Sequence, residues 1–88
     1  MKLKHDFIVR EIVGEYVLIP MGESALKLSG FLTTNEVGAT LMEELKEKRT
    51  PEQLLEKILE EFDVDEKTAS EDIEEFISLL KSQNFIEE

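Results

Sequence analysis

The sequence predicts an α+β fold in which a three-stranded antiparallel sheet is followed by a three-helix bundle. Two patterns carry this prediction. Residues 6–29 contain short apolar runs rich in β-branched side chains, with Gly and Pro between them, as is typical of strands and turns. Residues 35–83 repeat apolar side chains at the spacing of amphipathic helices. A length of 88 residues fits one domain with a modest core, so we expect a single domain over residues 1–88.

Three apolar runs predict the strands. Residues 7–13 and 16–19 are separated by Gly14 and Glu15, and a Gly at the first turn position predicts a two-residue hairpin. A loop with Pro20 and Gly22 follows, and residues 25–28 predict the third strand. With strands in up-down order, the third strand lies at an edge of the sheet, where its backbone groups are free to pair with another chain.

The first helix is predicted over about residues 35–46. Thr33, with Glu36 three residues later, is a candidate capping box at its start. Gly38 lies inside this helix, where it is about 1 kcal/mol less favourable than Ala, so we expect another element to pack closely against it. The apolar stripe that marks the buried face of the helix consists of Val37, Leu41 and Leu45.

The second and third helices are predicted over about residues 51–62 and 66–83. Thr50 and Gln53 form a capping box around Pro51, which suits the first helical position. Asp65 is the expected cap of the third helix. We interpret the apolar stripe of the third helix as core: Ala69, Ile73, Phe76 and Leu80. The apolar pair that follows this helix, Phe85 and Ile86, is expected to pack on the core.

The helical half carries the whole net charge of −11. Residues 1–34 contain four basic and four acidic residues, whereas residues 35–88 contain six basic and seventeen acidic ones. Three helices beside a small sheet form a winged-helix-like layout, which DNA-binding proteins use. DNA affinity, however, comes largely from Lys and Arg side chains that neutralise phosphates. Because the predicted third helix is acidic, we expect no nucleic-acid partner.

Two features of the sequence were considered for metal binding, and each lacks residues that a metal site needs. Residues 63–74 place acidic side chains as a calcium loop does, but Lys67 stands at a ligand position and Thr68 where the sharp turn needs Gly. We interpret this segment as an inter-helix turn followed by a capped helix start. His5 is the only histidine and the chain has no cysteine, so a typical transition-metal site is not expected.

Catalytic groups are not apparent in the sequence. The carboxylates are spread over helix faces, and no Gly-rich phosphate loop or activated Ser or Cys is recognisable. No serine stands in the Asp-Ser-Leu context of an acyl carrier protein. We therefore expect a protein that is not an enzyme and has no cofactor. Because no apolar run approaches a bilayer span of about 20 residues, we also expect no membrane contact and a cytoplasmic location.

Several segments, taken together, resemble PqqD-like proteins. These proteins are the stand-alone peptide-recognition domains used in making ribosomally synthesised and post-translationally modified peptides (RiPPs). The segment containing Gly38 is the most specific, and Met42 stands where many relatives have a large aromatic residue. The segments are Ala25-Leu26-Lys27-Leu28, Thr34-Asn35-Glu36-Val37-Gly38-Ala39, Leu41-Met42-Glu43-Glu44-Leu45, Thr50-Pro51-Glu52-Gln53-Leu54, Phe62-Asp63-Val64-Asp65 and Asp72-Ile73-Glu74-Glu75-Phe76.

The resemblance implies a non-catalytic chaperone for a precursor peptide. In such domains the leader of the precursor adds as a strand beside the third strand (β-augmentation) and lies against the third helix. The domain then presents the leader to a modifying enzyme, often a radical S-adenosylmethionine (SAM) maturase. The peptide-binding residues implied for this chain are Ala25, Leu26, Lys27, Leu28, Ser29, Thr68, Asp72, Glu75, Phe76 and Leu79.

Three alternatives stay open at this point. One flank of the apolar stripe on the third helix carries Thr68, Asp72, Glu75 and Leu79, and the other carries Ser70, Glu74, Ile77 and Lys81. We favour the first flank, because Leu79 offers an apolar anchor beside two acidic groups. The alternative function is an acidic, winged-helix-like interaction or regulatory module that binds no leader. An exposed edge strand is compatible with a monomer or with a strand-exchanged dimer.

Overall fold

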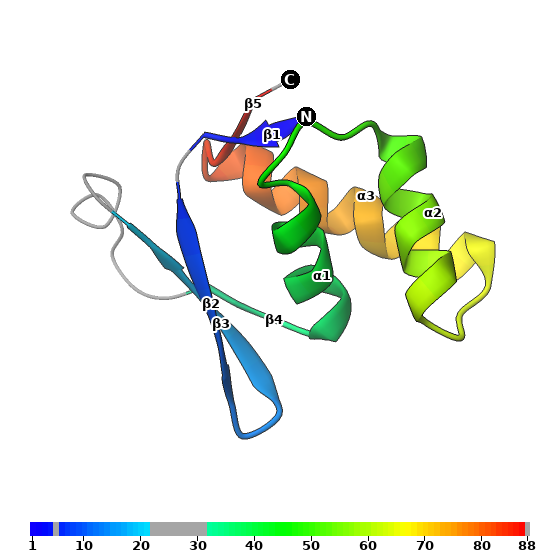
Figure 1. Ribbon diagram of the computed structural model, residues 1–88, viewed down its shortest axis with the longest axis horizontal. Helices are drawn as coiled ribbons and strands as arrows, with labels where there is room; N and C mark the ends of the chain where they lie inside the picture. Colours follow the sequence, from blue (N-terminus) through cyan, green and yellow to red (C-terminus); the bar gives the residue numbers. More distant parts are fainter. Residues whose placement is uncertain (5, 22–31, 88) are drawn as a thin grey trace.

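The computed structural model describes residues 1–4, 6–21 and 32–87 and confirms the α+β fold. In Figure 1 the three helices pack together, and the β2–β3 hairpin projects away from them. The short strand β4 leads from the sheet into the first helix (Figure 1). In chain order, the elements are β1 (Lys2–Leu3), β2 (Phe7–Ile12), β3 (Glu15–Pro20), β4 (Leu32–Thr34), α1 (Glu36–Glu44), α2 (Pro51–Glu61), α3 (Glu66–Ser82) and β5 (Ile86–Glu87).

The hairpin between β2 and β3 turns one residue earlier than the sequence predicted. Val13 and Gly14 form the turn, with φ values of 48° and 79°, and Ile12 pairs with Glu15. Positive φ at both central residues is the requirement of a type I′ turn. The predicted turn at Gly14 and Glu15 was wrong. It would have placed an acidic residue opposite the buried Leu18, whereas the observed register places Val9 there.

The third strand of the described sheet is β4, which pairs antiparallel with β3 in the order β2-β3-β4. The strand predicted at residues 25–28 lies outside the described residues. Thr33 belongs to β4 and pairs with Val17, so the predicted capping box at Thr33 was wrong. Asn35 is the N-cap of α1 instead, and its side-chain oxygen accepts a hydrogen bond of 2.9 Å from the backbone N–H of Gly38.

The predicted caps of α2 and α3 are confirmed. Both bonds of the capping box are present: the Gln53 N–H donates to Thr50 Oγ1 over 3.2 Å, and the Thr50 N–H donates to Gln53 Oε1 over 2.9 Å. Asp65 caps α3, where its carboxylate accepts from the N–H of Thr68. No helix in the described ranges is long and apolar enough to cross a membrane.

A Schellman-type turn ends α3 and sends the chain back into the core. Asn84 adopts a φ of 60°, its N–H donates to the Lys81 carbonyl, and the N–H of Phe85 donates to the Leu80 carbonyl over 2.9 Å. The Phe85 side chain is 4% exposed, and its ring packs edge-on against Phe7 with centroids 4.9 Å apart. Burying a side chain of this size contributes roughly 2 kcal/mol. Packing of Phe85 and Ile86 on the core is thus confirmed.

The two ends of the described chain form a small second sheet that the sequence did not predict. β1 pairs antiparallel with β5, with Leu3 opposite Ile86. The N–H of Leu3 also donates to the Leu45 carbonyl over 2.9 Å, just beyond the end of α1. Strands of two residues carry too little periodicity to be recognised in a sequence.

The core lies between the helices and the inner face of the sheet. Its most deeply buried side chains, each no more than 1% exposed, are Leu18, Leu41, Met42, Leu45, Leu54, Ile58, Ala69 and Leu80. The predicted stripe of α3 is buried throughout. α3 therefore packs by its apolar stripe and by Ile77, and the exposed and half-buried side chains of its flanks remain for other contacts.

The cap of α3 predicts a pH dependence of stability. A side-chain hydrogen bond from Thr68 is the main cause that holds the pKa of Asp65 below its ordinary value of 3.8. A carboxyl group whose pKa is lower in the folded than in the unfolded chain stabilises the fold at pH values above the unfolded-state pKa. This contribution is lost as the pH falls through the folded-state pKa. We expect Asp65→Asn, which keeps a capping side chain, to show a smaller fall in Tm between about pH 5 and pH 3 than the unchanged chain. Parallel Tm profiles, followed by circular dichroism, would contradict this role of Asp65.

Candidate functional site

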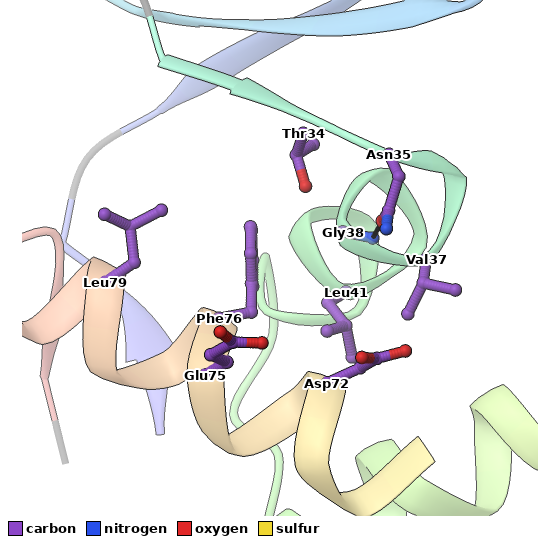
Figure 2. A pocket seen from close by; sticks show the side chains of 9 residues that line it. All are labelled: Thr34, Asn35, Val37, Gly38, Leu41, Asp72, Glu75, Phe76 and Leu79. Atoms are coloured by element: carbon purple, nitrogen blue, oxygen red, sulfur yellow. Dashed lines mark hydrogen bonds between the residues drawn. The ribbon is translucent and has the colours of Figure 1, made fainter. Parts of the chain in front are cut away.

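A groove with a volume of about 370 Å³ lies between the start of α1 and one flank of α3 (Figure 2). We refer to it as the α1–α3 groove. Its lining combines apolar side chains, which provide a floor, with two carboxylates and the polar groups at the junction of β4 and α1. The residues are Thr34, Asn35, Val37, Gly38, Leu41, Asp72, Glu75, Phe76 and Leu79.

The wall formed by β4 and α1 depends on Gly38. A Cβ built on Gly38 would overlap Oγ1 of Thr34 and would lie 2.8 Å from the Thr34 Cβ. Only glycine therefore allows Thr34 to sit this close to α1. The expectation that another element packs closely on Gly38 is confirmed, and that element is the end of β4.

The wall formed by α3 presents four residues at positions i, i+3, i+4 and i+7, which lie on one face of a helix: Asp72, Glu75, Phe76 and Leu79. Phe76 is 8% exposed and belongs mainly to the core, whereas Leu79 is only partly buried. Figure 2 shows both side chains extending from α3 toward the β4 side of the groove. They provide the apolar surface of this wall.

Some acidic side chains of the bundle form ion pairs with nearby cations. Glu44 lies 3.3 Å from Arg49 and 3.7 Å from Lys57, and Glu61 lies 3.0 Å from Lys57. Within the described residues, neither Asp72 nor Glu75 forms such an ion pair. The groove thus carries negative charge that no described cation neutralises.

A second hollow, the α2–α3 groove, lies on the opposite flank of α3 and has a volume of about 530 Å³. It is the larger of the two, but it is closed on its far side by α2 rather than by a strand. Its lining residues are Met1, Pro51, Glu52, Leu55, Ser70, Ile73, Glu74, Ile77, Ser78 and Lys81. Each flank of α3 that the sequence offered as an alternative therefore borders its own groove.

The α1–α3 groove is the one that adjoins a sheet edge. β4 is the last strand in the order β2-β3-β4, and among the described residues no strand pairs with its outer side. Thr34, the final residue of β4, also lines the groove. Among the described residues, an unpaired strand edge and the side chains of α3 therefore meet at this groove.

The model of the family described as coenzyme PQQ synthesis protein D (PqqD) matches residues 15–86 of this chain. The chain belongs to the PqqD family. The matched region begins in β3 and ends in β5, so it includes both walls of the α1–α3 groove. The resemblance that the sequence segments indicated is confirmed.

A solved structure with the same fold is titled "TbiB1 in Complex with the TbiA(beta) Leader Peptide". It is similar to this PqqD-family chain with a TM-score of 0.71 and 25% sequence identity. The similarity covers 99% of this chain and 95% of the TbiB1 chain. A search of curated proteins returned no match.

The structure brings together four of the residues that the sequence singled out as peptide-binding. Asp72, Glu75, Phe76 and Leu79 all line the α1–α3 groove. Thr68 is exposed on α3 but is not part of the lining. The other predicted residues lie outside the described ones: Ala25, Leu26, Lys27, Leu28 and Ser29.

Sequence reasoning missed the opposite wall, which Thr34, Asn35, Val37, Gly38 and Leu41 provide. It assigned Val37 and Leu41 to the buried face of the first helix and predicted no peptide contact for this stretch of the PqqD-family chain. The one signal was Gly38, because a glycine inside a helix indicates close approach of another element, but it did not show which element approaches. In the described part of the chain, no three His, Cys, Asp or Glu side chains are grouped as metal ligands would be.

The contact between Gly38 and Thr34 can be tested by substitution. Helix propensity alone favours Gly38→Ala by about 1 kcal/mol, but the added methyl would force Thr34 away from α1. We expect the clash to dominate and to lower the free energy of unfolding by about 1–3 kcal/mol, measured by urea denaturation. Adding Thr34→Gly removes the obstructing side chain and should restore part of the loss. A stabilised Gly38→Ala variant, or a double variant whose effects simply add, would contradict the close contact.

Proposed function

We propose that this PqqD-family chain is a non-catalytic recognition element that binds the leader of a RiPP precursor peptide. Two findings support the proposal: membership of the PqqD family, and the similarity over nearly the whole chain to TbiB1, whose structure contains a leader peptide. The observation that carries it is the position of the α1–α3 groove, which lies between an acidic, partly apolar helix flank and the end of an edge strand.

The leader is proposed to bind by strand addition. An added strand gains main-chain hydrogen bonds that tolerate varied sequences, and its alternate side chains enter a neighbouring groove. β4 provides such an edge. The strand that the sequence predicts at residues 25–28 lies a few residues before β4 in the chain. In this arrangement Leu79 and Phe76 contact the apolar side chains of the leader that face α3.

The flank that carries Asp72 and Leu79 is favoured over the opposite one for a geometric reason. A strand paired with β4 would run beside the α1–α3 groove, since Thr34 belongs to both. The α2–α3 groove is larger, but its lining contains no residue of the sheet β2-β3-β4. A peptide held there would have no strand to pair with.

The proposed role is presentation, with the chemistry performed by another protein. The bound leader would be delivered to the enzyme that modifies the precursor, which in the proteins that this chain resembles is often a radical SAM maturase and otherwise another peptide-modifying enzyme. A short precursor gene and a maturase gene beside the gene for this chain would support that pairing. If instead the chain is an interaction module without leader binding, the leader encoded there would not bind.

Two variants that place a carboxylate in different grooves test the site. Leu79→Glu places a charge in the α1–α3 groove, and Leu55→Glu places one in the α2–α3 groove; both leucines are partly buried. The probe is a fluorescent synthetic leader of the precursor encoded beside this chain. We expect Leu79→Glu to raise Kd at least tenfold, and Leu55→Glu to leave Kd within about twofold, because only the former desolvates a charge against the leader. Tm values establish that both variants are folded, and the reverse pattern of Kd values would refute the choice of groove.

A further inference from the structure

The α1–α3 groove has an acidic part and an apolar part in a fixed order along α3. Asp72 and Glu75 are one helical turn apart, and Leu79 follows after one more turn. With a rise of about 1.5 Å per residue, Glu75 and Leu79 are separated by about 6 Å along the helix axis. Figure 2 shows the three side chains in this order along the helix.

The carboxylates of Asp72 and Glu75 form a like-charged pair at i, i+3 on the helix, which is unfavourable unless a cation is near. Among the described residues neither has an ion-pair partner, although Arg49 and Lys57 neutralise other acidic side chains of the bundle. Asp72 is also half-buried, so its charge is less screened by solvent than a fully exposed one. A cation arriving with a ligand would relieve this repulsion.

The α2–α3 groove has a different charge pattern. Its lining contains Glu52 and Glu74 but also Lys81, so both signs are present. In the lining of the α1–α3 groove, by contrast, Asp72 and Glu75 are the charged side chains and both are acidic. Of these two grooves, the one that adjoins the sheet edge is therefore the one whose charged lining side chains all have the same sign.

We propose that the α1–α3 groove selects leader segments in which a large apolar residue and a Lys or Arg stand two positions apart. Residues i and i+2 of a strand point to the same side and are separated by about 6.6 Å, which matches the spacing of Leu79 and Glu75 along α3. The apolar side chain occupies the part lined by Leu79 and Phe76, and the basic one reaches Glu75 and Asp72. This inference rests on the proposed leader binding and adds the chemistry that the site recognises.

A random peptide library displayed on phage tests the specificity without knowledge of the natural leader. Selection with the full chain should enrich sequences that contain an apolar residue and a Lys or Arg two positions apart, in one consistent order. Enrichment of acidic or uncharged sequences, or no enrichment above a library passed over an unrelated protein, overturns the inference.

Charge-neutral variants separate a local effect from the overall charge. Asp72→Asn with Glu75→Gln removes two charges from the groove, and Glu71→Gln with Glu74→Gln removes the same number from exposed positions of the same helix. For a selected basic peptide, the first pair should raise Kd about fivefold or more and flatten the dependence of Kd on salt, whereas the second pair should change Kd less than twofold. Equal effects of the two pairs would contradict specific recognition.

The same measurements distinguish failure of this inference from failure of the proposed function. If the encoded leader binds and responds to Leu79→Glu, but the library and the charge variants show no preference for basic residues, leader binding stands and the charge selection is wrong. If Leu79→Glu raises the Kd of neither the leader nor any selected peptide, the α1–α3 groove is not a peptide site. The charge selection and the proposed leader binding at this groove are then both wrong.

Discussion

The close contact between Thr34 and Gly38 is the constraint on which the rest of the site depends. β4 ends at Thr34 and α1 begins two residues later, so the chain must turn from strand to helix within a single residue, Asn35. Asn35 caps the helix, and Gly38 allows the end of the strand to lie against it. The sheet edge is thereby fixed beside the first turns of α1, which form one wall of the α1–α3 groove.

The other wall depends on how α3 is held at both ends. Asp65 fixes its start, and the turn at Asn84 fixes its end and returns Phe85 to the core. The apolar stripe of α3 is buried in the core, so the peptide contacts that we propose fall to Phe76 at its edge and to the flank beside it. On this flank Leu79 is partly buried, and among the described residues neither Asp72 nor Glu75 has an ion-pair partner, which suits the proposed peptide with apolar and basic side chains.

Much of this fold follows from local sequence signals. The capping box of α2, the Asp cap of α3 and the helical stripes were sufficient because each depends on residues within a few positions of one another. The hairpin turn was misplaced by one residue, since its register is decided by the pairing of Val9 with the buried Leu18 rather than by the glycine alone. The cap at Thr33 was also wrong, because pairing of Thr33 with Val17 draws it into a strand. Both errors concern pairing between strands, which the spacing of residues within one segment does not reveal.

Only one wall of the α1–α3 groove could be predicted from the sequence. Asp72, Glu75 and Leu79 could be selected as a helix flank by counting around the helix, and the structure places them in one groove. Their partners on α1 and β4 could not, since the meeting of two elements depends on tertiary packing. Gly38 indicated that some element approaches, and the structure identifies it as Thr34.

The proposed pairing of a leader peptide with the outer edge of β4, with its side chains against α3, can be tested by nuclear Overhauser effects in the complex of the isotope-labelled chain with the encoded leader. We expect interstrand backbone contacts between the leader and Leu32, Thr33 or Thr34, together with side-chain contacts to Phe76 and Leu79. Contacts confined to Leu55 and Ile77, in the α2–α3 groove, would contradict it.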